Sequence, residues 1–154
     1  MGLAVGDAVC GVRGDSVAVA DGVNVAVSVG RIDVATLGVA HPEDHAFLAS
    51  ERRRRFVYWK GANEAIGYGY IAPSGRIGPI AALDAGLLAP IAVDLIERVT
   101  PPGAYTTWVP GAADELFVTL LRAGMRFESF PALYLWDRPI ADFSRYLPIN
   151  LALL

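Results

Sequence analysis

The chain has 154 residues, of which 54% are hydrophobic and 19% charged, so it suits one globular domain and is unlike a disordered chain. The net charge of −3 argues against nucleic acid as the main partner. The single cysteine, Cys10, excludes an internal disulfide, which suits a cytoplasmic protein. No apolar run is long enough to span a bilayer, and no charged stretch precedes an apolar one at the N-terminus. We therefore expect neither a membrane span nor a signal peptide.

Residues 1–40 form a first segment that is rich in Val, Ala and Gly, and every aromatic residue lies from Phe47 onward. Valines alternate with small residues on both sides of Asp21-Gly22, a pattern that predicts a β-hairpin. Because these side chains bury little area, we expect the hairpin to be weak. The alternative is that the segment is an extension with little role in function.

Residues 41–154 have the pattern of an α/β domain. The stretch "HPEDHAFLASERRRR" predicts a short helix, and "RFVYWKG" predicts a strand because it is rich in aromatic and β-branched residues. A second strand at 66–71 is followed by the turn Pro73-Ser74-Gly75, which predicts a hairpin with the third strand, "RIGPIAAL". Pro79 lies inside that third strand and lacks an N–H group, so we expect a bulge there.

Asp84 is placed to cap a helix whose apolar residues recur at helical spacing as far as Val99. A fourth strand is predicted at 104–109, a second helix at 113–123, and a fifth strand at 126–136, "RFESFPALYLW". The order is β-β-β-α-β-α-β. It predicts a mixed central sheet with helices on both faces.

This order resembles the GNAT superfamily of N-acetyltransferases, in particular the C-terminal half-domain of its tandem-type members. The resemblance covers roughly residues 41–147 and depends on "GYGYIAPSGRIGPIAAL", the helix after it, and "TTWVPGAADELFVTLLRAGMRF". It implies an enzyme that transfers an acetyl group from acetyl-CoA to an amine. In this family the strands before and after the first long helix splay apart, acetyl-CoA lies in the gap, and N–H groups at the helix start hold the pyrophosphate.

Carried over to this chain, the resemblance implies acetyl-CoA contacts from Ala81, Ala82, Leu83, Gly86, Leu87 and Leu88. The family's phosphate loop usually has Arg or Gln ahead of its glycine, whereas here Asp84 precedes Gly86. A carboxylate at this point repels a pyrophosphate, so Asp84 is also interpreted as a simple helix cap. The departure keeps a second function open, a non-catalytic GNAT-like module that supports a partner domain in a tandem or a dimer.

The family often uses a Tyr to protonate the leaving thiolate, and the matching position here is Leu120. Tyr134, on the predicted last strand, is the candidate in its place. Tyr68 and Tyr70 alternate on one strand face and are candidates for lining the acceptor pocket, with packing in the sheet as the alternative. No residue specifies whether the acceptor is a small-molecule or a peptide amine.

The basic run at 52–55 has two interpretations, a site for an anion such as the 3′-phosphate of CoA and a solvated helix end. His41 and His45 would share a helix face, but two His and one Cys are too few for a Cys/His zinc site, and we expect no metal.

A strand edge beside Tyr134 and the apolar tail at 153–154 favour self-association or a second GNAT-like domain as partner. A third interpretation is a small-ligand-binding α+β domain that does not use CoA.

Overall fold

The computed structural model of the chain describes residues 13–15, 22–61, 64–128, 131–133 and 135–150. They contain a five-stranded sheet in the order β1-β2-β3-β4-β5, and all neighbouring strands are antiparallel. The predicted mixed sheet is therefore wrong for these strands, because the segments expected to add parallel strands after the helices form no strand in their described residues. The strands are β1 (Arg13–Asp15), β2 (Arg54–Lys60), β3 (Glu64–Ile71), β4 (Ile77–Ala82) and β5 (Tyr146–Leu147).

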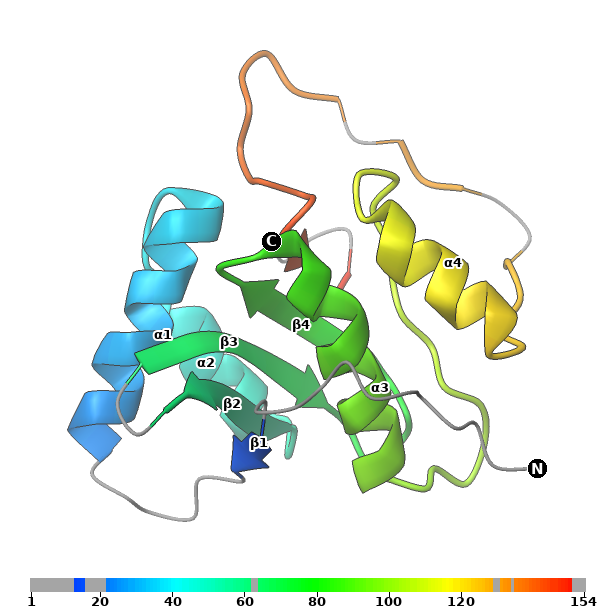
Figure 1. Cartoon of the computed structure of the whole chain (residues 1–154), viewed down its shortest axis with the longest axis horizontal. Helices are drawn as coiled ribbons and strands as arrows, with labels where there is room; N and C mark the ends of the chain where they lie inside the picture. The colour runs from blue at the N-terminus through cyan, green and yellow to red at the C-terminus, as the bar shows by residue number, and fades with distance from the viewer. Residues whose placement is uncertain (1–12, 16–21, 62–63, 129–130, 134, 151–154) are drawn as a thin grey trace.

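Helices cover both faces of the sheet, as predicted. On one face lie α1 (Gly22–Leu37) and α2 (Pro42–Ser50). On the other lie α3 (Leu88–Arg98), which follows the short 3-10 turn η1 (Ala85–Leu87), and α4 (Asp114–Arg122). Figure 1 shows α3 in front of the sheet, α2 behind it, and α4 beside α3. The molecule therefore belongs to the α+β class, with one hydrophobic core on each side of the sheet.

The central strand β3 presents small side chains to one face and large ones to the other. Gly67 and Gly69 face α3, so closely that an added Cβ on Gly69 would lie 2.7 Å from Leu95 Cδ1. Tyr68 and Tyr70 face α1 and α2, and both are fully buried. The two glycines allow α3 to approach the sheet, and the two tyrosines fill the wider space on the other side.

The middle of the chain matches its prediction. Strands β3 and β4 form the predicted hairpin, and their register shifts between Gly69 and Ile71, opposite Pro79, where a bulge was expected. Asp84 caps the turn before α3, since its side chain accepts a hydrogen bond from the Gly86 N–H. Helix α4 lies within the predicted range 113–123. These elements follow from local patterns, namely a Pro-Ser-Gly turn, an Asp cap and apolar residues at helical spacing.

The predicted β-hairpin of the N-terminal segment is wrong for residues 22–37, which form the helix α1. The residues of α1 that are buried recur at helical spacing, at Val25, Val29, Ile32, Asp33 and Thr36, whereas Val27 is 67% exposed. Packing of this face against the sheet overrides the β propensity of the valines. The part of the expected hairpin at 17–21 lies outside the described residues.

Two further predicted strands are not formed as expected. The segment 104–109 makes a single parallel bridge, between Thr106 and Arg76. The described residues of 126–136 are in no strand, and Leu133 and Leu135 are 86% and 92% exposed. The apolar alternation there predicts a strand, but the edge of β4 is already paired with β5, whose residues come from the tail. Figure 1 shows the chain after α4 running back to the sheet before it forms this pair.

Replacement of Gly69 by alanine should destabilise the fold, because the new methyl group would press on Ile91 and Leu95 of α3. We expect the free energy of unfolding, measured by urea denaturation, to fall by about 1–3 kcal/mol, as for other overpacked cores. Gly103→Ala is the matched control, since nothing lies within 4 Å of its added Cβ. Equal stability of the two variants would contradict the close approach of α3 to β3.

Candidate functional site

The six residues predicted to contact acetyl-CoA lie together at the end of β4 and the start of α3. Ala81 and Ala82 are the last residues of β4, Gly86 and Leu87 belong to η1, and Leu88 begins α3. The sequence therefore places them on one continuous strand-turn-helix junction. Whether that junction holds a phosphate depends on the N–H groups that it leaves open.

The backbone N–H groups of the strand end are already bonded within the chain. The Ala82 N–H donates to the carbonyl of Arg145 in the tail, at 3.0 Å, and the Leu83 N–H donates to Ile66 O, at 2.8 Å. Ala81 pairs with Tyr146 of β5 on one side and with Tyr68 on the other. The tail strand β5 thus lies along the part of β4 where the predicted contacts fall.

The N–H groups of the helix start are bonded as well. Gly86 donates to Asp84 Oδ1 at 2.9 Å, and Leu87 donates to Asp84 O at 3.1 Å. Leu88 donates to the carbonyl of Ala85. In this conformation Asp84 takes the place at the helix start that a bound anion would occupy.

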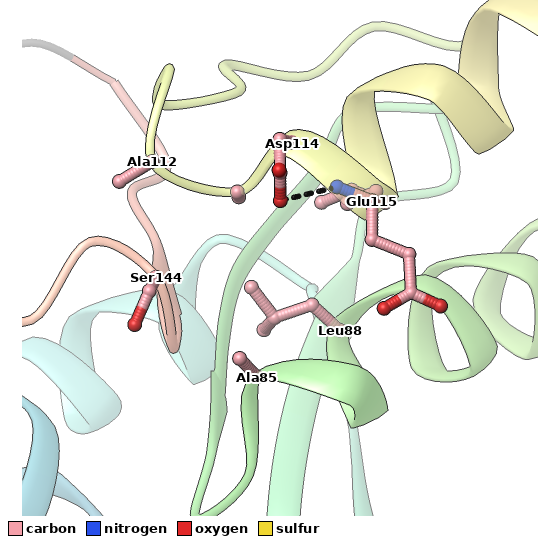
Figure 2. Close-up of a pocket in the computed structure, with 8 residues that line it drawn as sticks. Ala85, Leu88, Ala112, Asp114, Glu115 and Ser144 are labelled. Atoms are coloured by element: carbon pink, nitrogen blue, oxygen red, sulfur yellow. Dashed lines mark hydrogen bonds between the residues drawn. The ribbon is translucent and has the colours of Figure 1, made fainter.

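Figure 2 shows the hollow next to this junction. It lies between η1, the residues that lead into α4, and the tail, and its volume is about 40 Å³, which is room for a few water molecules. The carboxylates of Asp114 and Glu115 lie beside it, and Asp114 Oδ1 accepts a hydrogen bond from the Glu115 N–H at 2.8 Å. These two carboxylates give the rim of the hollow negative charge.

Tyr134, predicted to donate a proton to the leaving thiolate, lies outside the described residues, as do Cys10 and residues 153–154. The matching family position, Leu120, is buried in α4 and packs in the core with α3. Leu120 therefore adds no polar group to the junction.

A second constellation lies on the opposite face of the sheet, where Tyr68 and Tyr70 meet Asp33 and His45. The carboxylate of Asp33, which is 1% exposed, accepts a hydrogen bond from the Tyr68 hydroxyl at 2.6 Å. Its other oxygen lies 2.9 Å from His45 Nε2, and His45 Nδ1 lies 2.8 Å from the Tyr70 hydroxyl. A histidine with its proton on Nε2 satisfies every one of these contacts, donating to Asp33 and accepting from Tyr70.

Three elements bring these groups together. Asp33 lies on the buried face of α1, His45 on α2, and the tyrosines on β3. Gly38, with a φ of +81°, ends α1 in the left-handed conformation typical of a helix C-terminus and turns the chain toward α2. The His41 N–H then lies 3.4 Å from Asp33 Oδ2, so the turn itself is tied to the buried carboxylate.

Both tyrosines remain protonated at neutral pH. Burial, followed by the nearby carboxylate of Asp33, raises the pKa of Tyr68 well above its usual range. Burial raises the pKa of Tyr70 to about 12, against the opposing effect of the Arg55 guanidinium. The two phenols therefore act as hydrogen-bond donors rather than as bases.

The hydrogen bonds that link Asp33, His45 and Tyr70 lead to a pocket of about 400 Å³ between α2 and the strands β2 and β3. Its lining residues are His45, Ala46, Ala49, Arg53, Arg55 and Tyr70. Of the two tyrosines predicted to line an acceptor pocket, Tyr70 lines this one and Tyr68 lies behind it, as a partner of Asp33. A positively charged rim, a protonated phenol and an oriented imidazole suit binding of a polar, anionic molecule.

Sequence analysis missed Asp33 because it assigned the segment around it to a weak hairpin. The spacing of Val29, Ile32, Asp33 and Thr36 fits one helix face, and a carboxylate on such a face is the signal that could have identified a buried polar cluster. The sequence prediction considered His45 only together with His41, as a possible metal-binding pair. In the structure His41 does not join the cluster, and its Nδ1 lies 3.4 Å from Oδ2 of Asp44.

Comparison of the chain with models of known protein families, with curated proteins and with solved structures gives no significant match. The resemblance to the GNAT superfamily therefore depends on the sequence pieces quoted above alone. Within the described ranges, no helix is both long enough and apolar enough to cross a membrane.

Removal of the Asp33 carboxylate should destabilise the protein, because Tyr68 and His45 would be left with unmet hydrogen bonds in a buried place. For Asp33→Ala we expect the free energy of unfolding to fall by about 2–4 kcal/mol. Asp33→Asn should lose less, since the amide oxygen can still accept from Tyr68. The control is Asp137→Ala, at an exposed position, with no measurable change expected. A small effect of Asp33→Ala would contradict the buried network.

The raised pKa of Tyr70 makes stability depend on alkaline pH. Above pH 10 the unfolded chain ionises at this phenol while the native chain keeps its proton up to about pH 12, so stability falls across that interval. Urea unfolding of the wild type and of Tyr70→Phe should show the stability gap between them shrinking by about 1.4 kcal/mol from pH 8 to pH 11. A gap that does not change with pH would mean that Tyr70 titrates alike in both states.

Proposed function

We propose that the chain is an acyl-CoA-dependent N-acetyltransferase domain of GNAT type, which transfers an acetyl group from acetyl-CoA to an amine. One structural observation supports this beside the sequence resemblance. Strand β4 and the segment 104–109 are joined at their start, where the Ile77 N–H donates to Thr106 O at 2.8 Å and the Thr106 N–H donates to Gly75 O at 3.1 Å. After this single parallel bridge, β4 pairs with β5 instead.

The resemblance implies two parallel strands that meet at one end and part at the other, with acetyl-CoA in the gap. In this chain only the meeting point is formed, as the single parallel bridge, and the segment 104–109 is otherwise not a strand. In such a reaction the amine nitrogen attacks the thioester carbonyl and loses a proton. The C–S bond then breaks, and the CoA thiolate leaves and takes up a proton. The protein contributes chiefly by holding both substrates in line.

The tail has to move before acetyl-CoA can lie along β4, because the Ala82 N–H is bonded to Arg145 O. The side chain of Arg145 holds the tail in place. Its Nε donates to Asp142 Oδ2 at 2.6 Å, its Nη2 to Ala35 O at 2.9 Å, and its Nη1 to Leu83 O at 3.3 Å. Displacement of β5 is therefore a cost that acetyl-CoA binding must meet.

Calorimetric titration with acetyl-CoA tests the proposal on the wild type, Arg145→Ala and the control Arg138→Ala. We expect binding to the wild type, severalfold tighter binding to Arg145→Ala because the tail is held less firmly, and no change for Arg138→Ala, whose side chain is exposed. Release of free CoA thiol is then followed with a panel of amines. Failure of all three proteins to bind acetyl-CoA would reject the acetyltransferase proposal.

A second candidate function is the non-catalytic GNAT-like module that completes a partner domain. The observation that favours it is the state of the helix start, where Gly86, Leu87 and Leu88 all donate within the chain and Asp84 supplies the acceptors for two of them. A protein of this kind binds no acetyl-CoA in the titration above. It should instead show stable association, with a second copy or a partner domain, in sedimentation experiments.

A further inference from the structure

We infer that the pocket between α2 and the strands β2 and β3 binds a small molecule through an oxyanion, a carboxylate or a phosphate group, held by Arg53 and Arg55. The pocket lies on the α1–α2 face, whereas the N–H groups considered for acetyl-CoA lie at the end of β4 and the start of α3. The inference is therefore independent of the acetyltransferase proposal.

The two arginines of the pocket have no ion-pair partner among the described residues. The Nη1 atom of Arg53 is buried and has no hydrogen-bond partner there. Burial, followed by the neighbouring guanidinium of Arg76, lowers the pKa of Arg53, and the nearby carboxylate of Glu51 only partly opposes this effect. An anion in the pocket would relieve both costs.

Local structure aims the two arginines at the same place. The Arg53 N–H donates to Leu48 O at the end of α2, which fixes where β2 begins. Arg53 and Arg55 are two residues apart, and side chains with this spacing on an extended chain point to the same face. Arg55 also lies directly opposite Tyr70 in the antiparallel pair of β2 and β3. The pocket is thus built by backbone register rather than by loose surface side chains.

The opposite wall of the pocket is held by the buried network. His45 is fixed at both ring nitrogens, by Asp33 and by Tyr70, at 2.9 and 2.8 Å. The imidazole stacks against the Tyr70 ring, with centroids 5.8 Å apart and an interplanar angle of 19°. A wall fixed in this way binds a ligand without a large loss of side-chain freedom.

The lining defines the class of ligand. Guanidinium groups donate paired hydrogen bonds that match the oxygens of a carboxylate or a phosphate. A volume of about 400 Å³ lies within the range of about 300–1,000 Å³ found for small-molecule sites. The small side chains of Ala46 and Ala49 leave space for a short carbon skeleton. We therefore expect a small organic acid or a small phosphate ester rather than a polymer.

The chain has only two histidines, which makes the experiment specific. His45 lines the pocket, and His41 does not. Imidazole resonances are recorded by NMR during titration of the full chain with inorganic phosphate in one arm and malonate in the other. They are assigned with His41→Gln. We expect saturable movement of the His45 signals, with a dissociation constant of about 10 mM or tighter for at least one arm, and little movement of His41. The ligand with the lower dissociation constant, phosphate or malonate, is the oxyanion that the site prefers.

Matched variants come from the same basic run. Arg53→Gln and Arg55→Gln should each weaken binding at least tenfold, whereas Arg52→Gln and Arg54→Gln, at exposed positions outside the pocket lining, should change it less than twofold. Arg53→Lys and Arg55→Lys keep the positive charge but lose the paired hydrogen bonds of the guanidinium group, so they should retain part of the affinity. Urea unfolding checks that each variant is folded. Absence of His45 movement in both arms, equal movement of both histidines, or equal weakening by all four Gln variants would overturn the inference.

Discussion

Strand β3 is packed on both of its faces, and the sizes of its alternating side chains set how near each helical layer can come. On the α3 side, Gly67 and Gly69 leave only backbone, so Ile91 and Leu95 rest almost directly on the strand. On the other side two tyrosines keep α1 and α2 away from the sheet and bring polar atoms into the space between. Both the tight core and the polar cluster thus depend on one stretch, Gly-Tyr-Gly-Tyr.

The polar cluster shows what burial of a carboxylate requires. Burial removes the Asp33 carboxylate from water, which costs free energy. Hydrogen bonds from the Tyr68 hydroxyl to one oxygen and from His45 to the other offset this cost. Because each partner comes from a different element, the cluster joins α1, α2 and β3 at one point. The same contacts orient His45 and Tyr70 toward the arginine pocket, so stability and ligand recognition depend on the same atoms.

The parts of the fold that sequence analysis predicted are those governed by neighbours in the chain. The β3–β4 hairpin follows from its turn, and the start of α3 follows from Asp84. Helix α1 was predicted as strands because its alternating valines are typical of a β-strand. The sheet that buries one face of this helix is distant in sequence, so its effect could not be seen locally. The Asp33 cluster was missed for the same reason. Strand β5 could not be foreseen, since two residues carry no periodicity and their partner, β4, is more than sixty residues away.

The pairing of β5 with β4 has a further consequence for assembly. The edge of β4 is closed by only two residues, at the end of a long connection that makes no strand in its described part. Nothing in the hydrogen bonds between Ile80, Ala81 and their partners distinguishes a tail of the same chain from that of a neighbour. A monomer with its own tail in place and a pair of chains that exchange tails contain the same contacts. Protein concentration and the effective concentration set by the connecting segment then decide between the two forms.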